Sequence, residues 1–306
     1  MSNQNILPDS GPVVVGVDGS PASGLALTWA VEEAWLRSAD LKLITVLTTV
    51  IPPPTFGYVL PQDVADTSRF AAEAAERLKV AAEIAAHQRP DVTVTTEVSE
   101  GLVAASLLAA AKGAQLLVIG THGHGEIHDL MLGSVSRQVA AHAPCPLIVI
   151  PQPRNSSVAG PELGRVVVGV DGSAANESAI AAAFALADRR GLPLTAIHSW
   201  DVPSFDSVGL GAPIVLADAN EIEDGELRAM AESLSGWRAQ YPTVAVRQRI
   251  VHGSPAQVLV EASQGAAALV VGTRGRGGFV GLLLGSVSHA LLHHSGCPVM
   301  VVRLNS

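Results

Sequence analysis

The 306-residue chain contains the same set of short motifs twice, at a nearly constant distance. The segment VVVGVDGS at residues 13–20 recurs unchanged at residues 166–173, an offset of 153 residues. LLVIGTHGHG at residues 116–125 corresponds to ALVVGTRGRG at residues 268–277, an offset of 152 residues. Such a repeat is too long for a solenoid and has the length of a whole domain. The chain is therefore predicted to consist of two homologous domains.

The boundary between the two copies falls in PQPRNSSVAGPELG, at residues 151–164. This segment is rich in proline, serine and glycine, a composition typical of linkers. We expect domain 1 at residues 1–152, a linker at residues 153–164 and domain 2 at residues 165–306.

Within each copy, short apolar runs alternate with longer segments rich in alanine, leucine and glutamate. In the first copy strands are expected at residues 13–17, 41–48, 92–98, 115–119 and 146–150, and helices at residues 21–37, 63–88, 102–112 and 134–142. The short runs are apolar throughout, which is typical of strands buried on both faces of a parallel sheet. Each domain is therefore predicted to be a Rossmann-like, doubly wound α/β fold, with a five-stranded parallel sheet and helices on both faces.

The composition restricts the class of protein. Apolar residues make up 48% of the chain and charged residues 15%, enough for two packed cores. The net charge of −9 disfavours nucleic acid as a partner. The first residues lack a secretory signal, and no window offers about twenty uninterrupted apolar residues. We expect a cytoplasmic protein without a membrane span, in which Cys145 and Cys297 are reduced core residues.

A glycine pattern follows the fourth expected strand of each copy: Gly-x-x-Gly, nine further residues, and Gly-Ser at the start of a helix. Its residues are Gly120, Gly123, Gly133 and Ser134 in the first copy and Gly272, Gly275, Gly285 and Ser286 in the second. In open α/β sheets, ligands bind beyond the carboxyl ends of the strands where the strand order reverses. Backbone N–H groups of glycines and of a helix N-terminus suit a phosphate there. Alternatively, the glycines only shape a loop and the serine caps the helix; retention in both copies favours a phosphate site.

The first glycine loop also contains His122, His124 and His128, which by themselves allow a metal site. The second copy has Arg274 and Arg276 in place of the first two histidines and a valine in place of the third. Arginine is not a metal ligand, but it binds phosphate through its planar guanidinium. We therefore predict no dedicated metal site and count both arginines as candidate phosphate contacts. Magnesium carried by bound phosphates is compatible with this prediction.

Other histidines allow two interpretations. His142, His289, His293 and His294 lie on the last expected helix of each copy. A pair spaced i, i+4 can bind a metal, but such residues also simply cover a partly exposed helix face. His198 lies in an apolar strand and is expected to be a core residue with its hydrogen bonds satisfied.

The glycine pattern resembles the ATP-binding motif of the universal stress protein family. The VVVGVDGS segments and the APCP and SGCP segments before the last strands are also similar to that family. The likeness covers nearly the whole chain and points to the tandem-domain branch common in actinobacteria. It implies a strand order of 3-2-1-4-5 and one ATP site per domain, hence two ATP molecules per chain.

The resemblance also implies individual contacts. The aspartate after the first strand, Asp18 or Asp171, would hold the adenosine part of ATP, although an aspartate in this context also forms turns. The phosphate contacts would be Gly120, Gly123, Gly133, Ser134, Val135 and Ser136 in domain 1 and Gly272, Gly275, Gly285, Ser286, Val287 and Ser288 in domain 2. Gly101 and Gly253 are weaker candidates, either as turn formers or as points where adenine approaches the backbone.

No residue is predicted to be catalytic. The chain has neither the GK[ST] motif of P-loop proteins nor the SGGxDS loop of adenylating relatives. No residue stands out for positioning an attacking water molecule. Three hypotheses follow: an ATP-binding regulatory module read by a regulatory protein partner in stress or growth control; a slow ATPase or autophosphorylating enzyme; and an interaction module that has lost nucleotide binding.

The last strand of each domain is expected at a sheet edge. The runs PLIVIP and PVMVVR are apolar and need to be covered. The resemblance implies that such edges pair, so we expect an intramolecular pseudo-dimer of the two halves, and a further homodimer is compatible with the sequence. Residues 50–62 and 201–217 differ most between the copies and are candidate lids or partner surfaces.

Overall fold

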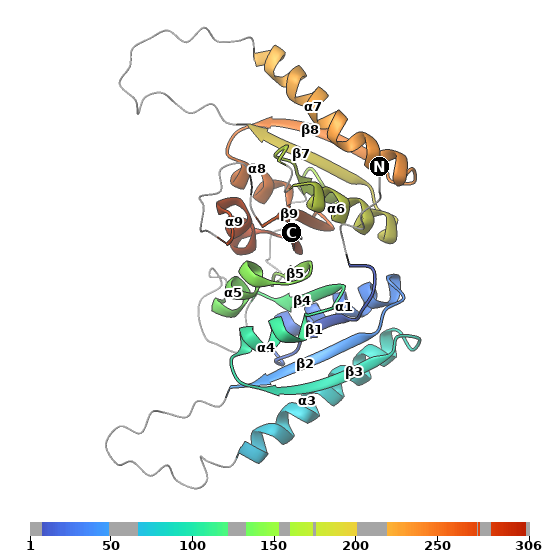
Figure 1. Cartoon of the computed structure of the whole chain (residues 1–306), viewed down its shortest axis with the longest axis vertical. Coiled ribbons are helices and arrows are strands. Elements are labelled where there is room, and N and C mark those ends of the chain that lie inside the picture. The colour runs from blue at the N-terminus through green and yellow to red at the C-terminus, as the bar shows by residue number, and fades with distance from the viewer. Residues whose placement is uncertain are drawn as a thin grey trace, which may run out of the picture. The chain divides into compact units, whose positions relative to one another are not determined.

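The computed structural model (Figure 1) describes residues 8–48, 67–121, 133–152, 160–173, 176–200, 219–273, 275 and 283–303. The chain divides into two compact units, Met1–Gln152 and Pro153–Ser306. The candidate lid segments, residues 50–62 and 201–217, lie outside the described residues.

Unit 1 contains a five-stranded parallel sheet with the order β3-β2-β1-β4-β5. Its strands are β1 (Val13–Gly16), β2 (Leu41–Leu47), β3 (Val94–Glu100), β4 (Leu116–Gly120) and β5 (Leu147–Ile150). Its helices are α1 (Pro21–Leu36), α3 (Thr67–Gln88), α4 (Val103–Ala110) and α5 (Ser134–His142). The predicted fold and strand order are confirmed, although β3 lies two residues further along the chain than its apolar pattern indicated.

Unit 2 repeats this topology, with the order β10-β9-β6-β7-β8 and parallel pairing throughout. Its strands are β6 (Val166–Gly169), β7 (Leu194–Trp200), β8 (Val246–His252), β9 (Ala268–Gly272) and β10 (Val299–Val302). Its helices are α6 (Glu177–Arg190), α7 (Ala219–Gln240), α8 (Pro255–Ala262) and α9 (Ser286–His294). In sheet order, β6 corresponds to β1 and β9 to β4.

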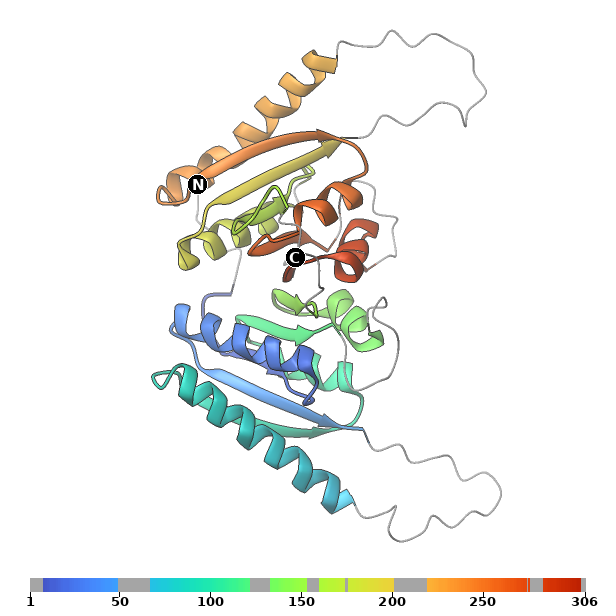
Figure 2. The same cartoon turned by 180° about the vertical axis from the view of Figure 1, so that it is seen from behind.

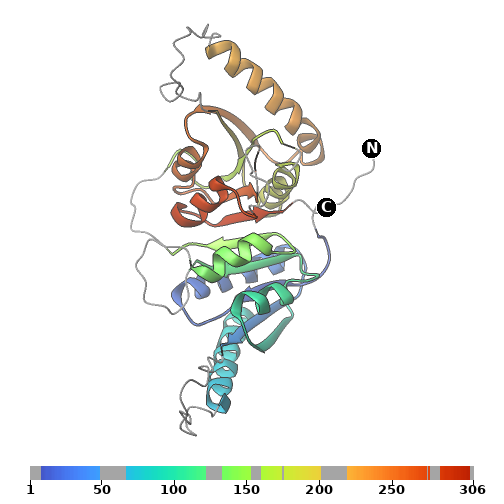
Figure 3. The ribbon, with the colours of Figure 1, turned by 60° about the vertical axis from the view of Figure 1, so that its left-hand side comes forward.

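The helices of each unit form two layers. In unit 1, α4 and α5 pack together on one face of the sheet (Figure 1), and α1 and α3 pack together on the other (Figure 2). In unit 2, α6 packs with α7, and α8 with α9; α7 runs along β8 (Figure 3). Right-handed crossovers require this arrangement, because the chain moves outward along the sheet through α1 and α3 and returns through α4 and α5.

Small residues let the first helix approach the sheet closely. Ala22, Ala26, Ala30 and Ala34 on α1 are all completely buried, as are the valines of β1. The helix begins at Pro21, whose missing N–H would have no helical partner in that position. The Ser20 side chain caps the helix by accepting a hydrogen bond from the Ser23 amide. The start of α1, close to the end of β1, is therefore firmly placed.

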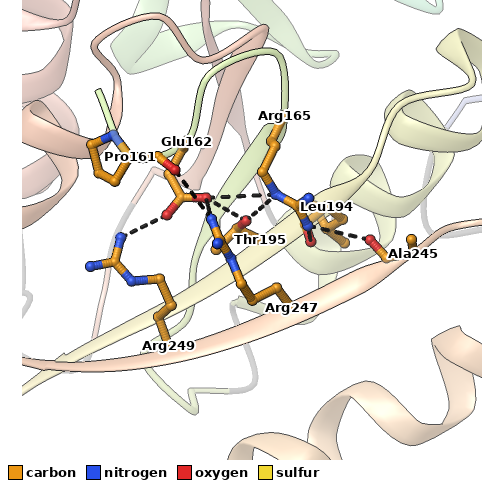
Figure 4. A network of polar contacts seen from close by, with 8 residues as sticks. All are labelled: Pro161, Glu162, Arg165, Leu194, Thr195, Ala245, Arg247 and Arg249. Carbon is orange, nitrogen blue, oxygen red and sulfur yellow. Dashed lines mark hydrogen bonds and ion pairs between the residues drawn. The ribbon is translucent and has the colours of Figure 1, made fainter. Parts of the chain in front are cut away.

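The segment that precedes β6 is packed against unit 2. The Gly160 amide donates to the Gln264 carbonyl at 2.9 Å, and a Cβ on Gly160 would meet the same oxygen at 2.3 Å. The Glu162 side chain is fully buried and lies among residues of β7 and β8 (Figure 4). Residues 160–164, whose composition predicted a linker, thus belong structurally to the second unit.

Glu162 is the centre of a charged network (Figure 4). Its carboxylate accepts hydrogen bonds of 2.6 Å from Thr195, Arg247 and Arg249. Arg165 lies 3.7 Å from the same carboxylate and donates to Thr195 at 2.7 Å. Burial alone would raise the pKa of Glu162, but the three hydrogen bonds and the charge of Arg247 outweigh it and lower the pKa. Glu162 is therefore held in its charged form.

Candidate functional site

The reversal of strand order gives each sheet one switch point. In unit 1 it lies between β1 and β4, because α1 follows β1 onto one face and α5 follows β4 onto the other. In unit 2 it lies between β6 and β9 for the same reason. Ligands of doubly wound sheets bind at this position, beyond the carboxyl ends of the strands.

The two candidate aspartates lie at this edge and form identical turns. Asp18 Oδ1 accepts a 2.8 Å hydrogen bond from the Ser20 amide, and Asp171 Oδ1 accepts one of the same length from the Ser173 amide. Both side chains are half-exposed. One carboxylate oxygen thus stabilises the turn, as the turn-former interpretation expected. This role leaves Oδ2 of each aspartate at the edge of the sheet as a candidate ligand contact.

Unit 2 brings the aspartate and the glycine loop together. A Cβ built on Gly275 would lie 2.7 Å from Asp171 Oδ2, which is closer than any real Cβ contact. A glycine is therefore required at residue 275 if Asp171 is to keep this position. Gly123, Arg274 and Arg276, together with the histidines at 122, 124 and 128, lie outside the described residues.

Gly120 has a packing role. A Cβ at this position would meet the Cβ of Ala22 at 2.8 Å and the Ala22 carbonyl carbon at 2.9 Å. Gly120 therefore allows the end of β4 to pass directly beside the first turn of α1. Gly272 occupies the corresponding last position of β9. In unit 1, Gly120 thus lets the two sides of the switch point lie close together.

The third glycine of each motif is the N-cap of a helix. Gly133 is the N-cap of α5 and Gly285 is the N-cap of α9. Each donates its amide back to the loop: Gly133 to the Thr121 carbonyl at 3.1 Å and Gly285 to the Thr273 carbonyl at 2.7 Å. Because glycine has no side chain that could cap the helix, the first-turn amides receive no side-chain cap from this residue and are candidate donors to an anion. These amides belong to Ser134, Val135 and Ser136 in unit 1 and to Ser286, Val287 and Ser288 in unit 2.

The structure separates the two serines of each motif. Ser136 is buried, and its hydroxyl lies 3.0 Å from the Gly120 carbonyl and 3.1 Å from the Thr121 carbonyl. Ser288 is buried as well and donates to the Gly272 carbonyl at 2.7 Å. Ser134 and Ser286 are exposed. The buried serine thus ties the helix to the strand before it, while the exposed serine is accessible to solvent.

Gly101 and Gly253 act as turn residues. Their φ angles of 125° and 141° are ones that side chains rarely allow. Gly101 donates its amide to the Leu47 carbonyl and Gly253 to the Trp200 carbonyl, both at 3.0 Å. The turn-former interpretation accounts for both residues.

Sequence reasoning missed a polar contact to the backbone carbonyl that precedes each aspartate. In unit 1 the Thr45 hydroxyl donates to the carbonyl of Val17, which precedes Asp18. In unit 2 the His198 ring nitrogen Nδ1 lies 2.6 Å from the carbonyl of Val170, which precedes Asp171. His198 is a buried residue with a satisfied hydrogen bond, as expected. The signal in the sequence was a polar residue at the same repeat position inside two apolar strands.

The other candidate histidines lie on α5 and α9 and are half-exposed or exposed: His142, His289, His293 and His294. The rings of His289 and His293 are tilted by 46° with their centroids 4.5 Å apart, and His142 Nδ1 is 2.9 Å from the Gln138 carbonyl. The described part of the chain contains no group of three or more histidine, cysteine or acidic side chains that could hold a metal ion. Among the described helices, none has the length and apolar character needed to cross a bilayer.

Comparison with known proteins gives a consistent result for both units. The model of the universal stress protein family matches residues 10–151 and 162–303. A universal stress protein of Mycobacterium tuberculosis is 37% identical over 307 residues, covering 95% of each chain. One of Mycolicibacterium smegmatis is 36% identical over 295 residues, covering 95% of this chain and 96% of its own.

A solved structure has the same fold over the whole chain. The universal stress protein from Archaeoglobus fulgidus is 19% identical, covers 99% of each chain and superposes with a TM-score of 0.67. The family match spans both units, and the mycobacterial relatives cover nearly the full length. The chain therefore belongs to the universal stress protein family, as a member with two tandem domains.

Proposed function

We propose that each unit binds one ATP molecule at its switch point and that the protein is an ATP-dependent regulatory module of stress or growth control in the cytoplasm. The observation that carries the proposal is the contact of Gly275 with the Asp171 carboxylate, on the same sheet edge as the N-terminus of α9. This arrangement has a carboxylate, a glycine backbone and the amides of a helix N-terminus at the same edge of the sheet.

The chemistry of these groups matches the parts of a nucleotide. The Asp18 and Asp171 carboxylates can accept hydrogen bonds from ribose hydroxyls. The amides of residues 134–136 and 286–288 and the hydroxyls of Ser134 and Ser286 can donate to phosphate oxygens. The positive end of each helix dipole favours the same negative charge. Magnesium, if carried by the phosphates, would reduce their repulsion without needing ligands from the protein.

A slow ATPase or autophosphorylating enzyme is the second candidate. The lack of a Walker lysine in the sequence favours ATP that is held, or turned over slowly, above rapid hydrolysis. In the regulatory function, a partner protein would distinguish the ATP-loaded state from the empty one.

Nucleotide release tests the proposal directly. Purified full-length protein is denatured, the supernatant is analysed for adenine nucleotides, and stripped protein is titrated with ATP by calorimetry. We expect two ATP molecules per chain, and we expect Asp18→Ala and Asp171→Ala each to remove one of them. If no adenine nucleotide is released and no heat of binding is measured, the proposal is wrong and the interaction module without nucleotide is favoured.

Release of radiolabelled γ-phosphate separates the two candidates. A binding module leaves the label on ATP over many minutes. A slow enzyme releases it as phosphate, or transfers it to the protein, in proportion to enzyme concentration. If the double variant Asp18→Ala/Asp171→Ala neither releases nor transfers the label, the activity belongs to the two sites and not to a contaminant.

A further inference from the structure

The two candidate sites differ in the side chain that bonds to the backbone carbonyl before the aspartate. In unit 2, His198 on β7 is 9% exposed and connects two different elements. Its Nδ1 lies 2.6 Å from the Val170 carbonyl, and its Nε2 lies 3.4 Å from Oε2 of Glu226 on α7. Because a carbonyl oxygen can only accept, Nδ1 carries a hydrogen, and the charge of the ring depends on a second proton at Nε2.

The position of Asp171 depends on this ring. Val170 directly precedes Asp171, and both of its backbone polar groups bond to β7. Its amide donates to the Ile197 carbonyl at 2.8 Å, and its carbonyl accepts from His198. Asp171 then makes its turn with Ser173 and places Oδ2 against Gly275. A shift of His198 would therefore be transmitted through one peptide unit to the carboxylate.

Unit 1 lacks both partners of this ion pair. Thr45 occupies the position of His198 and donates to the equivalent carbonyl of Val17. The helices α3 and α7 both contain 22 residues, and the eighth residue is Ala74 in α3 and Glu226 in α7. Ala74 is buried, so no carboxylate is present at this position of unit 1. In unit 1, a hydroxyl that does not titrate near neutral pH thus takes the place of the histidine, and an alanine takes the place of its acidic partner.

One proton decides how Nε2 interacts with Glu226. When Nε2 is unprotonated, its lone pair and the carboxylate are both acceptors and cannot bond directly. When a proton from solvent binds at Nε2, the ring donates to Val170 on one side and to Glu226 on the other. The ring is then fixed from both directions.

Other titratable groups surround the pair. Asp171 follows Val170 in the chain, and His252 on β8 packs edge-on against Trp200, two residues beyond His198 on β7. Asp224 and Arg228 flank Glu226 on α7, but both are exposed and therefore screened by solvent. Glu226, in ion-pair distance of Nε2, is the group whose charge acts most directly on the ring.

We propose that His198 and Glu226 are positioning residues that make nucleotide binding in unit 2 dependent on pH, whereas binding in unit 1 lacks this dependence. The inference rests on the proposed function, because it concerns the same sites. A proton at Nε2 of His198 preorganises the Asp171 turn, so the affinity of unit 2 for ATP rises as the pH is lowered from about 8 to about 6. Because Glu226 is about one-third exposed, we expect a modest effect, about 5-fold.

The test compares the two sites within the full-length chain. Asp18→Ala leaves only the unit 2 site and Asp171→Ala leaves only the unit 1 site. ATP is titrated into each by calorimetry at about pH 8 and about pH 6. Because the titration of ATP itself affects both sites equally, the ratio of the two affinity changes isolates the contribution of the protein. We expect the affinity of unit 2 to increase about 5-fold more than that of unit 1.

Two substitutions in the Asp18→Ala background assign the effect. His198→Thr introduces the residue of unit 1 and should reduce the pH response to that of unit 1. Glu226→Gln should also remove the response, with ATP bound tightly at both pH values, because its amide can donate to an unprotonated Nε2. Glu226 is half-exposed, so this second variant does not require repacking of the core.

The outcomes separate the two proposals. If both sites bind ATP with the same pH ratio, or if His198→Thr retains the response of unit 2, the inference is wrong and the proposed function stands. If neither site binds ATP at either pH, both are wrong.

Discussion

Asp171 and Gly275 are in such close contact that a Cβ on the glycine would lie 2.7 Å from Oδ2 of the carboxylate. Asp171 begins the turn after β6, and Gly275 lies in the loop after β9, so the contact joins the two sides of the switch point. The glycine motif and the aspartate, which are about a hundred residues apart, therefore act as one structural unit.

Gly275→Ala should weaken ATP binding at unit 2 about 10-fold, because the added methyl group displaces the Asp171 carboxylate. Calorimetric titration of the Asp18→Ala background measures this site alone. Gly236→Ala on α7 is the matched control, since a Cβ there meets nothing within 4 Å. It should leave affinity unchanged and stabilise the helix by about 0.5–1 kcal/mol. Unchanged affinity in Gly275→Ala would show that this contact has no part in binding.

The fold could be predicted because it depends on features that a sequence displays directly. Repeated motifs at a constant offset indicate two domains, and apolar runs of strand length between helical segments indicate a parallel sheet. The strand boundaries were less accurate where the pattern is polar. In β3, for example, every residue is half-exposed or exposed, so no change in hydrophobicity marks where the strand begins and ends.

The site could be predicted only in part, because burial and long-range pairing are not visible in a motif. Ser134 and, after it, Ser136 are both candidates from the sequence, and only the structure separates the exposed residue from the buried one. His198 and Glu226 are paired across two elements. Glu162 was hidden in a segment whose proline and glycine content indicated a linker, because composition does not reveal the arginines that meet its side chain.

Ser136→Ala and Ser134→Ala should therefore have different effects. Removing the buried Ser136 hydroxyl breaks its bond to the Gly120 carbonyl and should lower the free energy of unfolding by about 1 kcal/mol. Removing the exposed Ser134 hydroxyl should leave stability within about 0.5 kcal/mol and weaken ATP binding in unit 1. Urea unfolding and ATP titration measure the two effects. The assignment of roles is refuted if both variants change stability equally.

Both cysteines should resist alkylation in the folded protein. Burial raises the pKa of Cys145 and of Cys297 to about 12. At pH 8 roughly one thiol in ten thousand would then be the reactive thiolate, and the reagent also has little access. Iodoacetamide should label neither residue before denaturation and both afterwards, as measured by peptide mass spectrometry. Rapid labelling of one cysteine in folded protein would indicate local opening around its strand.

Glu162→Gln should destabilise unit 2 in a pH-dependent way. Because the pKa of Glu162 is lowered in the folded state, its charge stabilises the fold above the ordinary glutamate pKa of about 4.3. This contribution is lost as the pH falls from that value through the lower folded pKa. We expect a loss of about 1–2 kcal/mol near pH 7, because Arg247 and Arg249 are 48% and 35% exposed and can be rehydrated.

The matched control lies on the equivalent strands of unit 1. Glu97→Gln removes the ion pair of Glu97 with Lys42, which are 41% and 28% exposed, and should cost less than about 1 kcal/mol. Urea unfolding at about pH 7, 5 and 3.5 follows both variants. The difference between Glu162→Gln and the parent protein should stay constant between pH 7 and 5 and decrease at the lowest pH. A difference that is the same at all three values would mean that the side chain contributes through its shape and not through its charge.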